Sequence, residues 1–158
     1  MVTASHDRSA GPAAAGPAAA PGAAAPGAAP ADARSIDELL DAARRRLDRV
    51  DPARAQREIA QGALLVDIRP QQQRRAEGTV PGALHVERNV LEWRFDPRSD
   101  ARLPEATGYD LRIIIMCSAG YASSLAAAAL QDLGLHNATD LDGGYLAWQA
   151  ADLPTQPG

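Results

Sequence analysis

Two short apolar segments, separated by stretches with helical patterns, limit the fold of this chain more than any other feature. The segments are ALLVDI (63–68), directly after Gly62, and RIIIM (112–116), which lies between polar flanks. Both are short and rich in branched residues, as expected of strands buried on both faces of a parallel sheet. Strands that alternate with helices predict an α/β domain whose parallel sheet is covered on both sides.

The rest of the pattern predicts where helices and further strands lie. Ser35 and Glu38 have the spacing of a capping box, so SIDELLDAARRRLDRV (35–50) is expected to form one amphipathic helix. A second helix is expected to end at Gly62. The remaining expectations are helices at 69–78, 88–95, 122–134 and 145–154, and strands at 83–86 and from 138 onward.

Composition separates a tail from the domain. Residues 1–33 are nearly all Ala, Pro and Gly, which cannot fill a core, so we expect a disordered tail before a domain at 34–158. The formal net charge of −4 argues against nucleic acid as the main partner. The basic run at 44–46 is expected to be a solvated helix face, with a patch that binds an anion or a partner as the alternative.

Neither a secretory signal nor a membrane helix is expected. The first residues, MVTASHDRSAG, lack a basic segment followed by an apolar core. No apolar stretch approaches about 18 residues, the length of a membrane helix. Because a single cysteine cannot form an intramolecular disulfide, a cytoplasmic location without a membrane partner is the default expectation.

The single cysteine, Cys117, lies directly after the apolar segment 112–116, where a strand is expected to end. In open parallel sheets, ligands gather at the carboxyl ends of strands, and a helix that begins there brings unpaired N–H groups and partial positive charge. Such a field stabilises a thiolate, and Gly120 allows the backbone to curl around the sulfur. The alternative is that Cys117 is a small, inert apolar residue.

No metal or cofactor is expected. His6, His85 and His136 are scattered along the chain and lack the spacing of metal ligands. The chain also has no second thiol that could resolve an oxidised Cys117.

Four segments together resemble one known family. They are VDIRP (66–70), EGTVPGALHV (77–86), CSAGYASSLAAAAL (117–130) and LDGGYLAW (141–148). Their order and spacing are similar to those of the single-domain rhodanese-like sulfurtransferases, and the resemblance covers about residues 35–155. It implies a rhodanese-like α/β fold with a central five-stranded parallel sheet and helices on both faces.

The resemblance also implies roles for individual residues. Cys117 is implied to be the nucleophile, which carries sulfur as a persulfide from a donor such as thiosulfate to a thiol or cyanide acceptor. Asp67 and Arg69 are implied to support the fold beside the loop. Apart from the resemblance, Arg94 is a candidate for substrate binding, with a position at the surface as the alternative. The other residues expected to bind substrate are Ser118, Ala119, Gly120, Tyr121, Ala122 and Ser123.

Departures from the family pattern bear on the substrate. Family loops that use thiosulfate well often carry arginine or lysine just after the cysteine and at the loop's end, where this chain has Ser118 and Ala122. Thr79 also replaces the usual histidine of the second motif. We therefore expect weak thiosulfate activity, with a persulfide, a polysulfide or a protein-bound donor more natural.

Two other functions compete with sulfur transfer. A phosphatase of the Cys-x5-Arg type is not expected, because Ser123 stands where its arginine belongs. The hypothesis from another class is a non-catalytic rhodanese-like module that binds a partner or senses redox state. The missing loop arginines favour that module, whereas the intact Cys117 and Gly120 favour the enzyme.

Overall fold

The computed structural model describes residues 27–158, and the chain divides into two units, residues 1–33 and Arg34–Gly158. The predicted disordered tail falls mainly on residues 1–26, which lie outside the described residues. The fold and the candidate site belong to the second unit.

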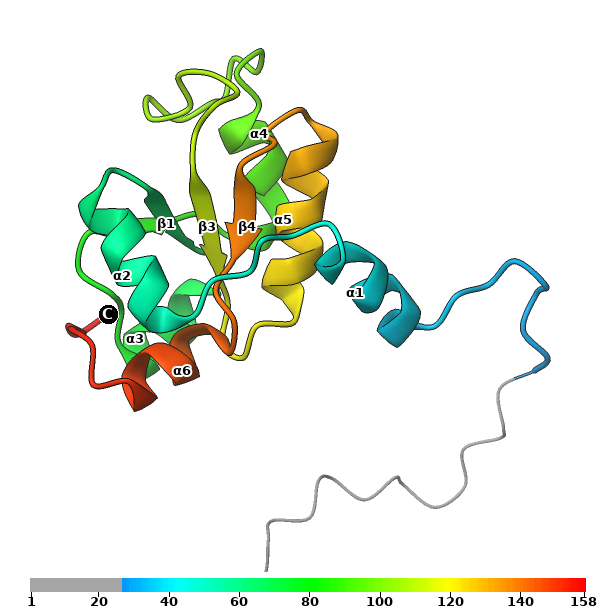
Figure 1. Ribbon diagram of the computed structural model, residues 1–158, viewed down its shortest axis with the longest axis horizontal. Helices are drawn as coiled ribbons and strands as arrows, with labels where there is room; N and C mark the ends of the chain where they lie inside the picture. Colours follow the sequence, from blue (N-terminus) through cyan, green and yellow to red (C-terminus); the bar gives the residue numbers. More distant parts are fainter. Residues whose placement is uncertain (1–26) are drawn as a thin grey trace, which may run out of the picture. The chain divides into compact units, whose positions relative to one another are not determined.

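A four-stranded parallel sheet lies at the centre of this unit (Figure 1). The strands are β1 (Leu64–Asp67), β2 (Leu84–His85), β3 (Ile113–Met116) and β4 (Ala138–Asp140), and their order across the sheet is β2-β1-β3-β4. Every pairing is parallel, as the two apolar segments predict.

The expected fifth strand is reduced to a single residue. Val50 forms an isolated parallel bridge with Leu141 beyond the end of β4. It cannot extend into a strand, because the next residue, Asp51, is the N-cap of a helix and Pro52 has no N–H to donate. The five-stranded sheet is therefore corrected to four strands and one bridge.

Six α-helices connect and cover the strands. They are α1 (Ile36–Arg44), α2 (Pro52–Ala60), α3 (Gln71–Glu77), α4 (Leu91–Phe95), α5 (Ala122–Asp132) and α6 (Gly144–Ala150), with a 3-10 turn η1 (Arg88–Val90) before α4. In this described part of the chain, no helix is both long and apolar enough to cross a membrane.

The first helix is shorter than the pattern predicts. Ser35 and Glu38 form the expected capping box, but α1 ends at Arg44 instead of continuing to Val50. Residues 45–49 leave the helix so that Val50 can reach the edge of the sheet. This path brings the basic residues near position 45 close to the carboxyl ends of the strands.

Alternate residues of β3 pack against helices on opposite faces of the sheet. Ile113 and Ile115 belong to a core cluster with α4 and α5, whereas Ile114 and Met116 belong to a second cluster with α2 and α6. All four β3 side chains are fully buried, which is why the segment reads as a continuous apolar run. Helix α1 packs against the outer side of α5 (Figure 1).

The strand register places three strand ends together. Asp67, the last residue of β1, pairs with Met116 of β3, and Asp140, the last residue of β4, pairs with Ile115. Cys117 therefore follows the end of the central strand, with one carboxylate-bearing strand end on each side.

Candidate active site

Cys117 opens a tight loop between β3 and α5, with only 9% of its surface exposed. The loop turns at Gly120, whose φ of +79° is in the left-handed region that favours glycine. A Cβ there would lie 2.8 Å from the amide nitrogen of Gly143. The loop can therefore pack this closely only without a side chain at position 120, as the sequence predicts.

The N-terminus of α6 holds one side of the loop. Tyr145 N–H donates to the carbonyl of Cys117 (2.8 Å), and Leu146 N–H donates to the carbonyl of Ser118 (3.0 Å). Gly144 lies against the same carbonyls, and a Cβ on it would come within 2.5 Å of the Cys117 oxygen. Two carbonyls of the loop are thus fixed toward α6.

Fixing these carbonyls also fixes the amides that follow them. In a trans peptide the C=O and N–H point in opposite directions, so the N–H groups of Ser118 and Ala119 point away from α6. Among the described residues, none accepts a hydrogen bond from the amides of residues 118–121. Consecutive unpaired amides of this kind can bind an anion.

A cleft of about 530 Å³ opens beside the sulfur. Its walls come from four places in the chain: residues 68–70, Gln73, residues 87–89, and the loop residues 117–119 and 121–122. The exposed ring of Tyr121 lies at this wall. Of the predicted loop residues, Gly120 and Ser123 do not line the cleft.

Ser123 lies behind the sulfur instead. The thiol of Cys117 donates to Ser123 Oγ (3.3 Å), and Ser123 donates to Asp140 Oδ2 (3.0 Å). Ser124 donates to the same carboxylate oxygen (2.7 Å), and both serines and Asp140 are fully buried. The cysteine is thereby connected through one hydroxyl to a buried carboxylate at the end of β4.

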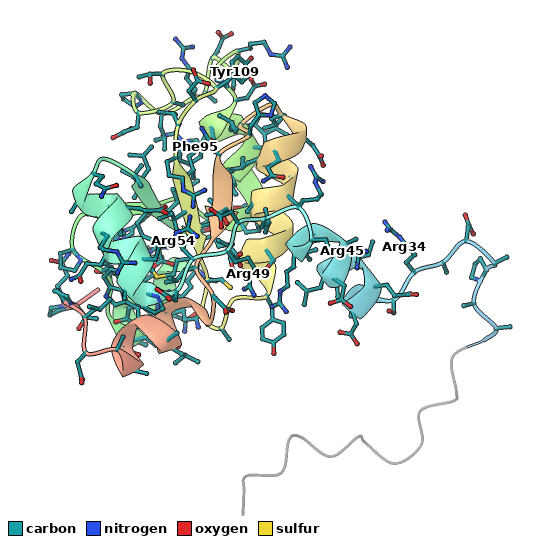
Figure 2. The ribbon with its side chains drawn as sticks, viewed as in Figure 1. Arg34, Arg45, Arg49, Arg54, Phe95 and Tyr109 are labelled. Atoms are coloured by element: carbon teal, nitrogen blue, oxygen red, sulfur yellow. The ribbon has the colours of Figure 1, made fainter. Side chains whose placement is uncertain are left out.

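Arg49 compensates the charge of Asp140. Its guanidinium donates through Nε to Asp140 Oδ1 (2.8 Å) and through Nη1 to Asp142 Oδ1 (2.9 Å), next to the end of β4 (Figure 2). A third donor, Nη2, reaches the carbonyl of Gly120 (3.1 Å). Burial alone would lower the pKa of Arg49, but the hydrogen bonds and charges of Asp140 and Asp142 raise it above its ordinary value.

Arg44 contacts the same loop from α1. Its Nη2 donates to the Gly120 carbonyl (2.7 Å), its Nε donates to Ser124 Oγ (3.2 Å), and its Cζ lies 5.3 Å from the centroid of the Tyr121 ring. Arg46 also bonds to α5, through Asp132 (2.6 Å). The expectation of a solvated helix face at 44–46 is corrected for Arg44, because α1 packs on α5 and directs this side chain to the loop, whereas Arg45 and Arg46 are exposed as expected.

Asp67 and Arg69 form a buried pair on the other side of the loop. Arg69 donates to both carboxylate oxygens of Asp67, to Glu77 Oε2 (2.9 Å) and to the Gly78 carbonyl (2.9 Å). Its Cζ also lies 3.8 Å from the centroid of the Tyr145 ring. These contacts join the end of β1 to α3 and α6, consistent with the supporting role that the sequence indicates.

Arg94 does not line the cleft. Its Nη1 donates to the carbonyl of Ala101 (2.6 Å) in the loop that follows α4, so its expected contact with substrate is corrected. Arg88 lines the cleft instead, where its Nη1 pairs with Glu92 (2.8 Å). A cation is thus present at the cleft, at Arg88.

Asp140, Arg49 and Arg44 are the site residues that sequence reasoning missed. Arg49 lies 91 residues from Asp140, and Arg44 lies 76 residues from Gly120. No local motif marks such pairs. One sequence signal pointed to them: the helical spacing of apolar residues in 35–50 continues to Val50, but the basic residues 44–46 and Arg49 interrupt it.

The fold and the loop together define an α/β domain that presents one cysteine at the end of its central strand. The model of the rhodanese-like domain family matches residues 51–151, and this chain belongs to that family. The resemblance that the four motifs indicate is confirmed.

Individual relatives agree with this assignment. The chain is 37% identical over 101 residues to thiosulfate sulfurtransferase GlpE of Pseudomonas fluorescens, a match that covers 64% of this chain and 84% of that protein. A solved structure from Rhodopseudomonas palustris, of unknown function and described as a possible tyrosine phosphatase, has a TM-score of 0.73 at 30% identity and covers 82% of this chain and 100% of that one. The human single-domain sulfurtransferase shares the fold, with a TM-score of 0.55 and 24% identity over 65% of this chain and 95% of that one.

Proposed function

We propose that this protein is a sulfurtransferase that carries sulfane sulfur as a persulfide on Cys117. The observation that carries the proposal is the loop itself. Its cysteine follows the central strand, its amides at 118–121 have no acceptor among the described residues, and it lines a cleft. The similarity to thiosulfate sulfurtransferase GlpE supports the same reaction class.

In the first half-reaction, Cys117 loses its proton to solvent and its thiolate attacks the outer sulfur of the donor. A bond forms between Sγ and that sulfur, while the donor's own S–S bond breaks and the leaving group keeps the electron pair. With thiosulfate the leaving group is sulfite. The unpaired loop amides then donate hydrogen bonds to the persulfide.

In the second half-reaction, the acceptor attacks the outer sulfur of the persulfide. The S–S bond to Cys117 breaks, its electron pair returns to Sγ, and the sulfur leaves on the acceptor. A thiol acceptor yields a persulfide, and cyanide yields thiocyanate. The cysteine is restored as a thiolate, ready for another donor.

A phosphatase function is disfavoured by the same loop. A phosphoryl group with two negative charges is held best by a bidentate arginine, as in loops of the Cys-x5-Arg type. Here Ser123 occupies that position, and its hydroxyl is committed to Asp140. The six-residue loop suits a single sulfur atom better than a tetrahedral oxyanion.

The donor proposed is one with less charge than thiosulfate, such as an organic persulfide or a protein-bound one. Within the loop 117–122 there is no basic side chain. Arg88 is the cation that the structure offers at the cleft wall besides Arg69, whose guanidinium is already held by two carboxylates. Each missing charge-assisted hydrogen bond lowers the affinity for a dianion by about 1.5–3 kcal/mol.

The proposal is tested by mass spectrometry after incubation with thiosulfate or a polysulfide. Wild-type protein is expected to gain the mass of one sulfur atom on Cys117 and to lose it again when cyanide is added. Cys117→Ser, which keeps the size and polarity of the side chain, is the control and is expected to gain nothing. A wild type that acquires no sulfur from any donor contradicts the proposal and favours the non-catalytic module.

The donor assignment has its own test. Ala122→Arg places a cation at the end of the loop, and we expect thiosulfate:cyanide activity to rise about tenfold, as one added charge-assisted hydrogen bond allows. The matched control is Ala129→Arg, further along α5. No increase in the Ala122→Arg variant contradicts the explanation of weak thiosulfate use, although it leaves the reaction class intact.

A further inference from the structure

Two arginines that bind the cysteine loop lie outside the region that matches the family model. That match begins at residue 51, whereas Arg44 ends α1 and Arg49 lies just before the bridge residue Val50. Both donate to the carbonyl of Gly120, at 2.7 Å and 3.1 Å. The segment before the family domain therefore completes the wall behind the loop.

The orientation of the Gly120 carbonyl fixes the orientation of the Tyr121 amide in the loop. Because the peptide that joins it to Tyr121 is trans, two guanidinium groups holding the oxygen direct the Tyr121 N–H to the opposite side. Tyr121 itself lines the cleft. Arg44 also stacks on the Tyr121 ring, so it fixes both the amide and the side chain of this residue.

The two arginines differ in charge compensation. Arg49 pairs with Asp140 and Asp142, so this group carries no net positive charge. Arg44 forms no ion pair with any residue between 27 and 158; its partners are a carbonyl, a hydroxyl and an aromatic ring. It is half-buried, which reduces the screening of its charge by solvent.

We propose that Arg44 is a positioning residue for the sulfur-transfer reaction. From outside the family domain, it aims the Tyr121 amide at the bound sulfur and supplies the positive charge that the loop lacks at Ser118 and Ala122. The inference rests on the proposed sulfurtransferase function. It assigns the binding of anionic donors to a cation behind the loop.

The test compares two donors of different charge in the full chain, with cyanide as acceptor. Thiosulfate is a dianion, and benzenethiosulfonate is a monoanion that transfers its outer sulfur and leaves as benzenesulfinate. For Arg44→Gln, we expect the KM for thiosulfate to rise about tenfold and the KM for benzenethiosulfonate about threefold, with kcat within about twofold, because the lost interaction scales with donor charge.

Two further variants separate charge from packing. Arg45→Gln removes the same charge from the adjacent exposed position, labelled in Figure 2, and is expected to leave both KM values unchanged. Arg44→Lys retains the cation and one donor, and is expected to recover most of the affinity for thiosulfate.

Two results would overturn the inference while the wild type remains active. One is an Arg44→Gln variant whose KM values match those of Arg45→Gln. The other is an equal loss with both donors that lysine does not rescue, which indicates a purely structural role. The activity of the wild type is measured first, before any variant is compared with it. A wild type without activity overturns the proposed function and this inference together.

Discussion

Two clusters of arginine and carboxylate flank the cysteine loop, one at each neighbouring strand end, and they do different things. At the end of β1, Arg69 binds Asp67 and Glu77, and its remaining contacts are the Gly78 carbonyl and the Tyr145 ring. None of its hydrogen bonds reaches residues 117–122. This cluster joins the sheet to α3 and α6.

At the end of β4, the corresponding cluster is connected to the loop at two points. Arg49 bonds to Gly120, and Asp140 bonds to Ser123, which accepts the thiol hydrogen bond of Cys117. A change in this cluster therefore reaches the sulfur through Ser123, whereas Arg69 reaches the loop indirectly, through Glu77 and then Gln73 to the hydroxyl of Ser118. The two clusters contain the same kinds of residue at the ends of the two strands that neighbour β3, yet they have different roles.

The largest effect on stability is expected from Arg69→Met. The variant leaves the fully buried carboxylate of Asp67 without its cation, which costs about 3–5 kcal/mol in the free energy of unfolding. Activity per folded molecule is expected to fall less than in Arg49→Met, because Arg69 lines the cleft but donates no hydrogen bond directly to the loop. Urea unfolding and steady-state assays measure the two quantities, with Arg75→Met, an exposed neighbour on α3, as control. A stable but inactive Arg69→Met variant would break the comparison.

A smaller loss of stability, but a real loss of activity, is expected from Arg49→Met. Asp140 keeps two serine hydroxyls, and the Arg49 side chain is 19% exposed, so the cost in the free energy of unfolding is about 2–3 kcal/mol. The rate of sulfur uptake by Cys117 is expected to fall about tenfold, because the Gly120 carbonyl loses one of its two guanidinium donors. Unchanged uptake would show that the β4 cluster is also purely structural.

Ser123→Ala and Ser124→Ala sharpen the comparison within the β4 cluster. Each variant removes one hydrogen bond to Asp140, so each is expected to cost about 1 kcal/mol of stability. Of the two serines, Ser123 contacts Cys117, whereas Ser124 contacts the Gly120 carbonyl (3.3 Å), so Ser123→Ala is expected to slow sulfur uptake more, by about fivefold. Rapid-quench mass spectrometry measures the uptake rate, and equal rates for the two variants would argue against the connection through Ser123.

The smallest effect concerns pH and the β1 side of the sheet. Partial burial and then the nearby charge of Arg74 lower the pKa of His85, at the end of β2, below its ordinary value of 6.5. The unfolded chain therefore binds more protons as the pH falls below 6.5, and stability decreases there; it is fully regained above that pH. His85→Gln is expected to flatten this part of the stability profile. The measurement is the urea midpoint of unfolding at pH values from about 5 to about 7.5, the range in which a histidine titrates. A variant with the slope of wild type would assign the dependence to other groups.

The same contrast explains how much could be predicted from sequence. Asp67 and Arg69 are two residues apart in a recognisable motif, and the strand, the loop and Gly120 are likewise encoded locally by apolar runs and a required positive φ. Fold class, family and the position of the cysteine follow from such local signals. They were therefore predictable.

The β4 cluster could not be predicted, because it exists only after folding. Arg49 reaches Asp140 across 91 residues, and α1 ends early because Val50 gains a place on the sheet edge, where tertiary pairing outweighs helical periodicity. Arg94 shows the converse error: an arginine in a short helical segment was expected to contact substrate, but α4 directs it to Ala101.

The bridge at Val50 has a practical consequence for anyone who trims this protein. A fragment cut at the family boundary, residue 51, retains the nucleophile and every recognisable signature, yet it discards the edge pairing and both guanidinium groups behind Gly120. Sequence signatures alone would judge such a fragment complete, although its cysteine loop would have lost its rear support.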